Sequence, residues 1–409
     1  MKKIIFVSIT FFISFYTYDS FGQAEFSSGV KLLSKEQSRK IPLLRIKPRG
    51  ILELPERVDL SSYFPKPGDQ GRLNSCTAWA TGYALKSFQE RRELRNYSLE
   101  FSPSFIYNQI YPEETCSDGV YIEDALNFLS NNGCSLLYEF PYDEDCAKKP
   151  NENVIKRAKT YKILSYQKVL DKVGYFQDLN ISETKKFLVD SIPIVMALQL
   201  DKEAWKNTYG NRSDVNSPFV WNLYRGNCDA CYHAMVCVGY DEKIGALKFM
   251  DSRGVDRGNN GFMWISYEVA KRAAKVGYIA TDMVNGATDF LVNDFEPSNK
   301  IVESFDDEKQ RKEYSVVLRN GRYYAVGNNV KLGAAALDNS NDIAYVRLFE
   351  ESSARTSNLG LYKLSKDYDY SVLYYDQEIN IEFQDVKNFI SPRAEFKIST
   401  TKIIESNEE

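Results

Sequence analysis

Histidine is nearly absent from this chain: His233 is the only one in 409 residues. Any reaction that needs an imidazole as its general base therefore has one candidate here. A basic excess is absent as well, because 52 lysines and arginines stand against 56 aspartates and glutamates, for a net charge of −4. That balance argues against a general nucleic-acid partner, which would require a strongly basic surface.

Long apolar runs are lacking after the N-terminus. Two lysines precede an apolar stretch over residues 4–18, and Ser20 and Gly22 are small residues at the spacing of a signal-peptidase site. We therefore expect residues 1–22 to be a signal peptide that is cleaved after Gly22. The stretch is shorter than the roughly 20 residues that span a bilayer, and no cysteine directly follows it for lipid attachment. We expect a secreted or periplasmic protein that is not inserted into a membrane after cleavage.

The rest of the chain is long enough for two or three domains. Residues 23–52 are polar and basic and form either a short pro-segment or a flexible tail. Helical patterns come first and strand patterns second within residues 53–292, which favours an α+β domain of two lobes with an active site in the cleft between them. We expect a polar linker over residues 293–312 and a small all-β domain over residues 313–409.

Local patterns place the elements of these domains. Ser75 is a cap-type residue, and helical spacings of apolar side chains predict a helix over residues 76–92. Alternating apolar residues predict a strand over residues 233–240. Asn320 and Gly321 stand between two strand-like runs and predict a two-residue hairpin. Similar patterns predict a helix at 122–131 and strands at 192–200, 247–251 and 261–266.

Cys76 stands at the start of the predicted helix. A thiol attacks a carbonyl as its thiolate, and both a helix N-terminus and a neighbouring imidazolium lower the pKa of a cysteine. The helix supplies the first effect. His233 supplies the second if the fold brings its ring within about 3–4 Å of the sulfur. Cys76 is therefore the candidate nucleophile, and His233 is its candidate acid–base partner.

Seven cysteines in an exported chain permit disulfides and leave at least one thiol free. Cys76 is the expected free thiol, and Cys237, in an alternating strand, fits buried packing. A zinc site that used Cys228, Cys231 and the only histidine would consume the base and would need a fourth ligand. Haem attachment needs a histidine directly after the second cysteine, where Tyr232 stands. We expect a disulfide instead, either between these two cysteines or with a distant one.

Three segments together resemble the papain-like cysteine peptidases. They read Asp-Gln-Gly-Arg-Leu-Asn-Ser-Cys-Thr-Ala-Trp at 69–79, Tyr-His-Ala-Met-Val-Cys-Val-Gly-Tyr at 232–240 and Met-Asp-Ser-Arg-Gly at 250–254. The resemblance extends over about residues 54–284. It implies a two-lobed hydrolase that cleaves a peptide or protein substrate through a thioester acyl-enzyme, without a metal or cofactor. It indicates no ligand for the C-terminal domain.

The resemblance assigns roles to three further residues. Gln70 stands at the position of the family's oxyanion-hole glutamine, whose side-chain N–H stabilises the developing negative charge. Asp251 stands where the family usually has an asparagine that orients the histidine; an aspartate accepts the same hydrogen bond and adds a charge. Gly119 is the one glycine left of a pair that usually contacts the substrate backbone.

The sequence also departs from the family. Arg253 and Arg257 replace two tryptophans, and our hypothesis is that Arg253 partly neutralises Asp251 and shields its hydrogen bond to the histidine. Leu73 replaces a common cysteine, so Cys116 is expected to lack its usual disulfide partner. These departures leave two alternatives open. One is a papain-like fold that binds without cleaving, and the other is a transpeptidase that passes the acyl group to an amine.

Overall fold

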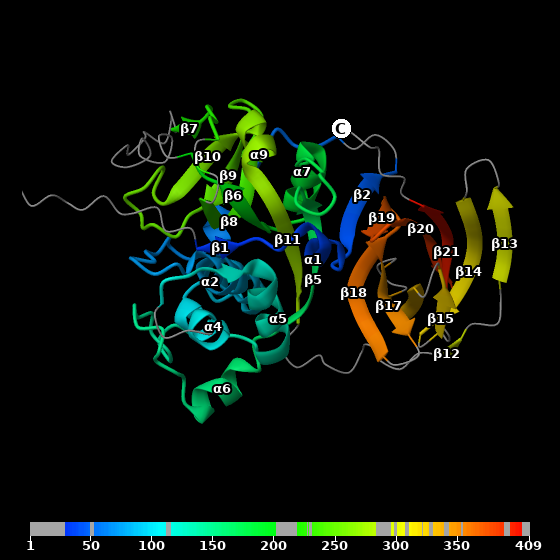
Figure 1. The fold of residues 1–409 in the computed structure, drawn as a ribbon, viewed down its shortest axis with the longest axis horizontal. Coiled ribbons are helices and arrows are strands. Elements are labelled where there is room, and N and C mark those ends of the chain that lie inside the picture. The colour runs from blue at the N-terminus through cyan, green and yellow to red at the C-terminus, as the bar shows by residue number, and fades with distance from the viewer. Residues whose placement is uncertain are drawn as a thin grey trace, which may run out of the picture.

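The computed structural model covers the larger part of the chain after residue 28 (Figure 1). The described residues are 29–49, 53–111, 116–201, 219–226, 228, 231–283, 296–297, 301–306, 311–320, 322–326, 330–338, 343–352, 355–387 and 393–402. The predicted signal peptide, residues 1–22, lies outside them. None of the helices in these ranges has the length and apolar character needed to cross a bilayer.

One lobe of the first domain is helical. Its central helix runs without a break from Cys76 to Leu94, and its middle part is wound as a π-helix. All residues from 75 to 91 are buried, so this helix forms the core of the lobe and is covered on every side. The helices of this lobe are α2 (Cys76–Ala78), η2 (Trp79–Lys86), α3 (Ser87–Leu94), α4 (Pro103–Ile110), α5 (Ile122–Asn132) and α6 (Glu152–Ala158).

The other lobe is built on a sheet in the order β5-β11-β6-β8-β9-β10-β7, with β3 paired to β8. Helices α7 (Ile181–Val189) and α9 (Tyr267–Ala273) pack against it. The predicted strands correspond to β6, β8, β9 and β10. The bounds are β3 (Arg57–Asp59), β5 (Ile163–Asp171), β6 (Ile194–Gln199), β7 (Val220–Trp221), β8 (Tyr232–Asp241), β9 (Ala246–Met250), β10 (Phe262–Ser266) and β11 (Ala274–Asp282), with a 3-10 turn η1 (Ser61–Tyr63).

The C-terminal domain is all-β, as predicted (Figure 1). Strands β13-β14-β21-β20-β19 form one layer and β12-β15-β16-β17-β18 form the other, with aliphatic side chains such as Val316, Leu348 and Ile381 buried. The bounds are β12 (Glu296–Pro297), β13 (Ile301–Asp306), β14 (Arg311–Arg319), β15 (Arg322–Ala325), β16 (Val330–Asp338), β17 (Ile343–Ser352), β18 (Arg355–Ser365), β19 (Tyr368–Tyr374), β20 (Gln377–Lys387) and β21 (Arg393–Lys402).

Two details of this domain differ from the predictions. The hairpin at Asn320 is not formed, because β14 pairs with β13 and β21 while β15 pairs with β12 and β16. β14 ends in one sheet and β15 begins in the other, where its antiparallel partner is the next strand along the chain, β16. Gly321 itself lies outside the described residues. The predicted linker 293–312 contains β12 and β13. Both lie at sheet edges, where polar strands are tolerated.

The segment that precedes the first domain is folded onto both domains. It forms β1 (Val30–Lys31), α1 (Lys35–Arg39) and β2 (Leu43–Pro48). Strand β1 pairs in parallel with β4 (Val120–Tyr121) of the helical lobe. Strand β2 pairs along its length with β19 and meets β5 at one residue pair. It thereby joins the sheet of the first domain to that of the C-terminal domain (Figure 1).

A buried ion pair and its hydrogen bonds hold helix α1 against the first domain. Nζ of Lys168 donates to the carbonyl oxygen of Ser38 at 2.6 Å and to its Oγ at 2.8 Å, and it pairs with Oδ2 of Asp171 at 2.8 Å. Oγ of Ser38 also donates to Asp171, at 2.8 Å. All three residues are fully buried. Since an unpaired buried charge is costly, detaching α1 would leave these groups unsatisfied, and the chain from α1 onward is a structural part of the fold.

Candidate active site

Cys76 is the first residue of the central helix, directly after Ser75. Its side chain is 0% exposed, and Sγ accepts a hydrogen bond from the backbone N–H of Ala234 at 3.4 Å. Burial by itself would raise the pKa of this thiol. The interaction with His233 and the Ala234 N–H outweigh burial, so the pKa of Cys76 lies below its ordinary value.

His233 lies on β8, and its ring is in direct contact with both acidic partners of the site. Nε2 donates to Oδ1 of Asp251 at 2.7 Å, which leaves Nδ1 for Cys76. Burial opposes the imidazolium, but the Cys76 thiolate and Asp251 together raise the pKa of His233 to about 9. The structure therefore brings the three residues together in the order thiol, imidazole, carboxylate, and it favours the ionic form of the first two.

Asp251 follows β9 and is buried. Its Oδ1 accepts a second hydrogen bond, from the backbone N–H of Ser252 at 2.7 Å. Burial alone would raise the pKa of this carboxyl group, but the hydrogen bond and charge of His233, followed by the charge of Arg257, bring the pKa of Asp251 below its ordinary value. The carboxylate is thus ionised and fixed in orientation by two donors.

Both arginines of this loop lower the pKa of Asp251 by their charge, as we expected of Arg253, but Arg257 has the larger effect. Nη1 of Arg253 donates to the carbonyl oxygen of Gly71 at 2.7 Å, which ties the loop after β9 to the segment before the nucleophile. Nε of Arg257 lies 3.5 Å from Oδ2 of Asp251, and the Arg257 side chain is buried. The sequence marked both positions as departures from the family. From the sequence we expected Arg253 to face the carboxylate, but the direct ion pair is made by Arg257.

Gln70 is fully buried beside the same loop. Its Oε1 accepts from Oγ of Ser252 at 2.7 Å, and its Nε2 donates to the carbonyl oxygen of Leu73 at 2.7 Å. A primary amide carries two N–H groups, so Nε2 can donate one more hydrogen bond. The amide plane is fixed by these contacts, as an oxyanion donor requires.

Tyr142 is a site residue that the sequence analysis did not identify. Its hydroxyl donates to the carbonyl oxygen of Gln70 at 2.7 Å and bonds Oγ of Ser75 at 2.8 Å. It therefore links the backbone of the candidate oxyanion donor to the residue that precedes the nucleophile. The sequence alone does not predict this role, because the three residues meet only in the folded chain.

The N-terminal segment lies against the candidate nucleophile. A Cβ atom built on Gly29 would lie 2.5 Å from Sγ of Cys76, and the carbonyl oxygen of Gly29 accepts from the backbone N–H of Val120 at 3.2 Å and from Oγ1 of Thr77 at 3.4 Å. Gly119 lies on the other side, where a Cβ atom would come within 2.3 Å of the Gly29 carbonyl. The candidate substrate-contact glycine is thus covered by the chain's own backbone.

The disulfides fit a folded, oxidised chain. Cys228 bonds Cys231, which is the local alternative among the two that the sequence left open. Cys116, expected to lack its usual partner, bonds Cys146. The free cysteines of the described residues are Cys76, Cys134 and Cys237, all buried.

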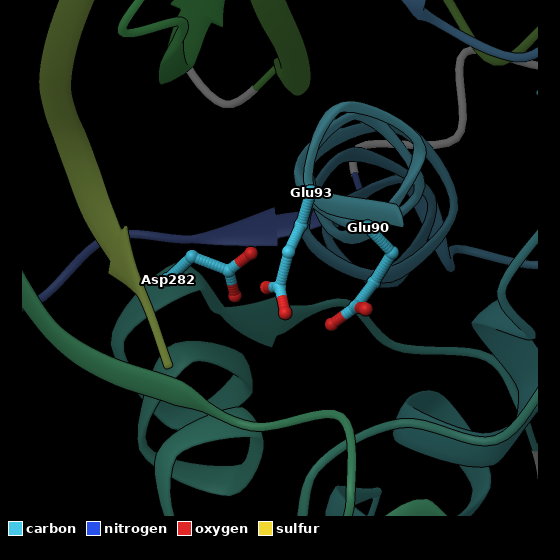
Figure 2. A group of neighbouring side chains, drawn as sticks. All are labelled: Glu90, Glu93 and Asp282. Atoms are coloured by element: carbon cyan, nitrogen blue, oxygen red, sulfur yellow. The ribbon is translucent and has the colours of Figure 1, made fainter. Parts of the chain in front are cut away.

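One cluster of acids elsewhere in the first domain resembles a metal site. Figure 2 shows Glu90 and Glu93 of α3 and Asp282 at the end of β11 pointing toward one another. The ammonium group of Lys86 lies among them, 2.6 Å from Oε1 of Glu90 and in contact with Asp282. A cation of the protein therefore already pairs with two of the three carboxylates, and we assign no metal to the cluster.

Comparison with known proteins agrees with this geometry. The model of the papain family cysteine proteases matches residues 54–284, which include the candidate nucleophile, histidine and aspartate. The chain belongs to this family. It is accordingly a papain-like cysteine peptidase, and its first domain has the fold of these hydrolases.

Two relatives indicate how far the likeness extends. An uncharacterised peptidase C1-like protein of Acanthamoeba polyphaga mimivirus is 24% identical over 262 residues, which are 62% of this chain and 81% of the viral protein. Xylellain, a cysteine protease from Xylella fastidiosa, superposes with a TM-score of 0.50 at 24% identity and covers 63% of this chain and 97% of its own. The likeness of xylellain supports the fold alone.

Proposed function

We propose that this papain-family protein is an exported peptidase that hydrolyses peptide bonds through a thioester intermediate. The observation that carries the proposal is the buried contact series of Cys76, His233 and Asp251 at the meeting point of the two lobes. Predicted cleavage after Gly22 supports export, and two disulfides fit an oxidising compartment. The substrate is a peptide or protein that enters along Gly119.

In the first step the Cys76 thiolate attacks the carbonyl carbon of the scissile peptide bond. The oxygen becomes negative and is stabilised by the backbone N–H of Cys76 and by Nε2 of Gln70. The C–N bond then breaks, and the imidazolium of His233 gives its Nδ1 proton to the leaving amine. In the second step His233 removes a proton from water, which attacks the thioester and releases the acid and the thiol.

We also propose that the folded chain is latent. The backbone of Gly29 stands beside Sγ of Cys76, and β1 occupies the strand position along β4. Helix α1 and β2 are integrated into the fold, so only the part upstream of Ser34 needs to leave the cleft. The connection from β1 to α1 is residues 32–34, which are half-buried except for the exposed Ser34, and we propose that a second peptidase cuts there.

The experiment that tests the function compares hydrolysis and active-site labelling. The chain is cut between β1 and α1, at residues 32–34, by limited proteolysis and assayed with a fluorogenic peptide library, with His233→Ala and Cys76→Ala as matched controls. We expect turnover after the cut, and we expect a thiol-directed epoxide to label Cys76 in the cut parent chain but to label neither cut control.

The outcome also separates the proposed peptidase from its alternatives. Labelling without hydrolysis, together with acyl transfer to an added amine, would favour a transpeptidase. Neither labelling nor turnover after the cut would contradict the proposal and favour a protein that binds without cleaving.

A further inference from the structure

The carboxylate that orients the only histidine shares its second oxygen with a buried cation. Oδ1 of Asp251 receives the Nε2 proton of His233, and Oδ2 faces Nε of Arg257 at 3.5 Å. The side chains of His233, Asp251 and Arg257 are between 0 and 1% exposed. Since a guanidinium loses its hydration on burial, it is kept in such a place only where a negative charge compensates it.

The loop after β9 holds Arg257 in this position. The backbone N–H of Gly261 donates to the carbonyl oxygen of Arg257 at 2.7 Å, and Asn259 and Phe262 exchange two backbone hydrogen bonds of 2.7 and 3.0 Å. Gly258 has a φ of 54° and a Cβ atom on it would lie 2.4 Å from the carbonyl oxygen of Phe262, so the tight turn requires glycine. These backbone hydrogen bonds fix the loop that carries Arg257, and the guanidinium of Arg257 lies against Asp251.

The charged groups around the imidazole now form an alternating series. Cys76 on α2 is the thiolate, His233 on β8 the imidazolium, Asp251 after β9 the carboxylate and Arg257 the guanidinium. Arg253, on the same loop, donates to a backbone carbonyl, and its charge also lowers the pKa of Cys76 and, less than that of Arg257, the pKa of Asp251. With Arg257 the four groups in contact carry no net charge. Without it, one excess negative charge would stand in a buried site.

We infer that Arg257 is a positioning residue that acts on His233 through Asp251. By balancing the carboxylate, it limits how strongly the imidazolium is stabilised and keeps the proton transferable to a leaving amine. An aspartate in this place would otherwise hold the imidazole proton more tightly than a neutral side chain does. The inference rests on the proposed peptidase function for its catalytic meaning, but the effect on the histidine can be measured without turnover.

The single histidine makes the test direct. In the full chain with labelled histidine, one imidazole resonance in NMR reports the pKa of His233. Replacing Arg257 with methionine should raise this pKa by about one pH unit, since a compensating charge is lost at short range. In an Asp251→Asn background the same substitution should move it by less than about 0.3 unit, because no carboxylate remains to transmit the effect. The matched control is Arg253→Met, which should move it by less than half as much.

Activity gives a second readout. Arg257→Met should lower kcat/KM at pH 7 by about tenfold or more, while Asp251→Asn with Arg257→Met should stay within about twofold of Asp251→Asn alone. Arg257→Lys, which keeps the charge, should hold the imidazole pKa near the parent value. If Arg257→Met does not fold but the double variant does, the charge coupling is equally supported.

Two results would overturn the inference. One is an imidazole pKa that Arg257→Met leaves unchanged, and the other is a shift of equal size in both backgrounds. Absence of hydrolysis in the parent chain, with the predicted NMR shifts intact, would contradict the peptidase proposal and leave the positioning role standing.

Discussion

Gly29 lies directly against the thiol of Cys76: a single methyl group on its Cα would come within 2.5 Å of Sγ. The same methyl group would lie 2.8 Å from the backbone carbonyl oxygen of Asn74, which cannot rotate away. The position therefore accepts only glycine while the segment stays in the cleft. This contact explains how one backbone can cover the nucleophile completely.

Gly29→Ala should activate the uncut chain. Forcing an extra methyl group into a close-packed site typically costs about 1–3 kcal/mol, which should displace the segment and raise the initial hydrolysis rate about tenfold. The rate is measured with a fluorogenic peptide on freshly purified protein. Lys31→Ala is the control, because Lys31 makes only an exposed ion pair with Asp118 at 2.9 Å and should change the rate less than about twofold. Equal rates for Gly29→Ala and the parent would refute latency by this segment.

The pH dependence of kcat/KM should be bell-shaped with its basic limb at about pH 9, the pKa of His233. Activity rises as Cys76 ionises, below the ordinary pKa of a cysteine, and falls when His233 loses its proton. Asp251→Asn removes a negative charge from the imidazolium, so the basic limb should move to lower pH. A basic limb that Asp251→Asn leaves in place would show that this carboxylate does not act on the histidine. The profile is measured on the cut chain.

Tyr142→Phe should lower kcat by about tenfold with little change in KM, because the lost hydroxyl positions the groups around the oxyanion and not the substrate. Each buried hydrogen bond that is lost also costs about 1 kcal/mol of stability. Tyr138→Phe is the control, since Tyr138 is 76% exposed. Steady-state kinetics and urea unfolding give both quantities. A change in KM alone would place Tyr142 in substrate binding.

Lys168→Met should destabilise the chain by about 3–5 kcal/mol, since it leaves the buried carboxylate of Asp171 without its cation. Burial lowers the pKa of Lys168 although Asp171 raises it, so the ammonium depends on this partner. Denaturant unfolding gives the value. Lys40→Ala is the control, because its ion pair with Glu36 is exposed, at 3.6 Å, and should contribute little. A loss below about 1 kcal/mol would show that α1 is not anchored by this charge.

The sequence predicted correctly those helices and strands whose pattern depends only on neighbouring residues. The helix that begins at Cys76 and the strand that carries His233 follow from side-chain periodicity, which is a property of neighbouring residues. The uniqueness of His233 reduced the choice of base to one residue. The pairing of Cys76 with His233 was expected because both stand in motifs that resemble one family, and the family match covers both.

Tertiary structure decided what depends on distant segments or on the path of a loop. Arg253 and Arg257 both stand in the loop after β9, and only the structure shows that Arg257 lies against Asp251 while Arg253 bonds the carbonyl oxygen of Gly71. Likewise, only the structure shows that β14 and β15 lie in different sheets, where β14 pairs with β21 at the end of the domain and β15 pairs with the next strand, β16.

The covering of Cys76 by the N-terminal segment also depends on strands that pair across long stretches of the chain. Gly29 meets Cys76 because β1 pairs with a strand about ninety residues later, and β2 reaches a strand more than three hundred residues away. Periodicity fixes which face of an element is apolar, so spacing predicted the helix at Cys76 and the strand at His233, while the resemblance to one family paired the reacting residues. Periodicity carries no information on which partner covers that face, since the free energy of such a pairing depends on contacts that form only in the folded chain.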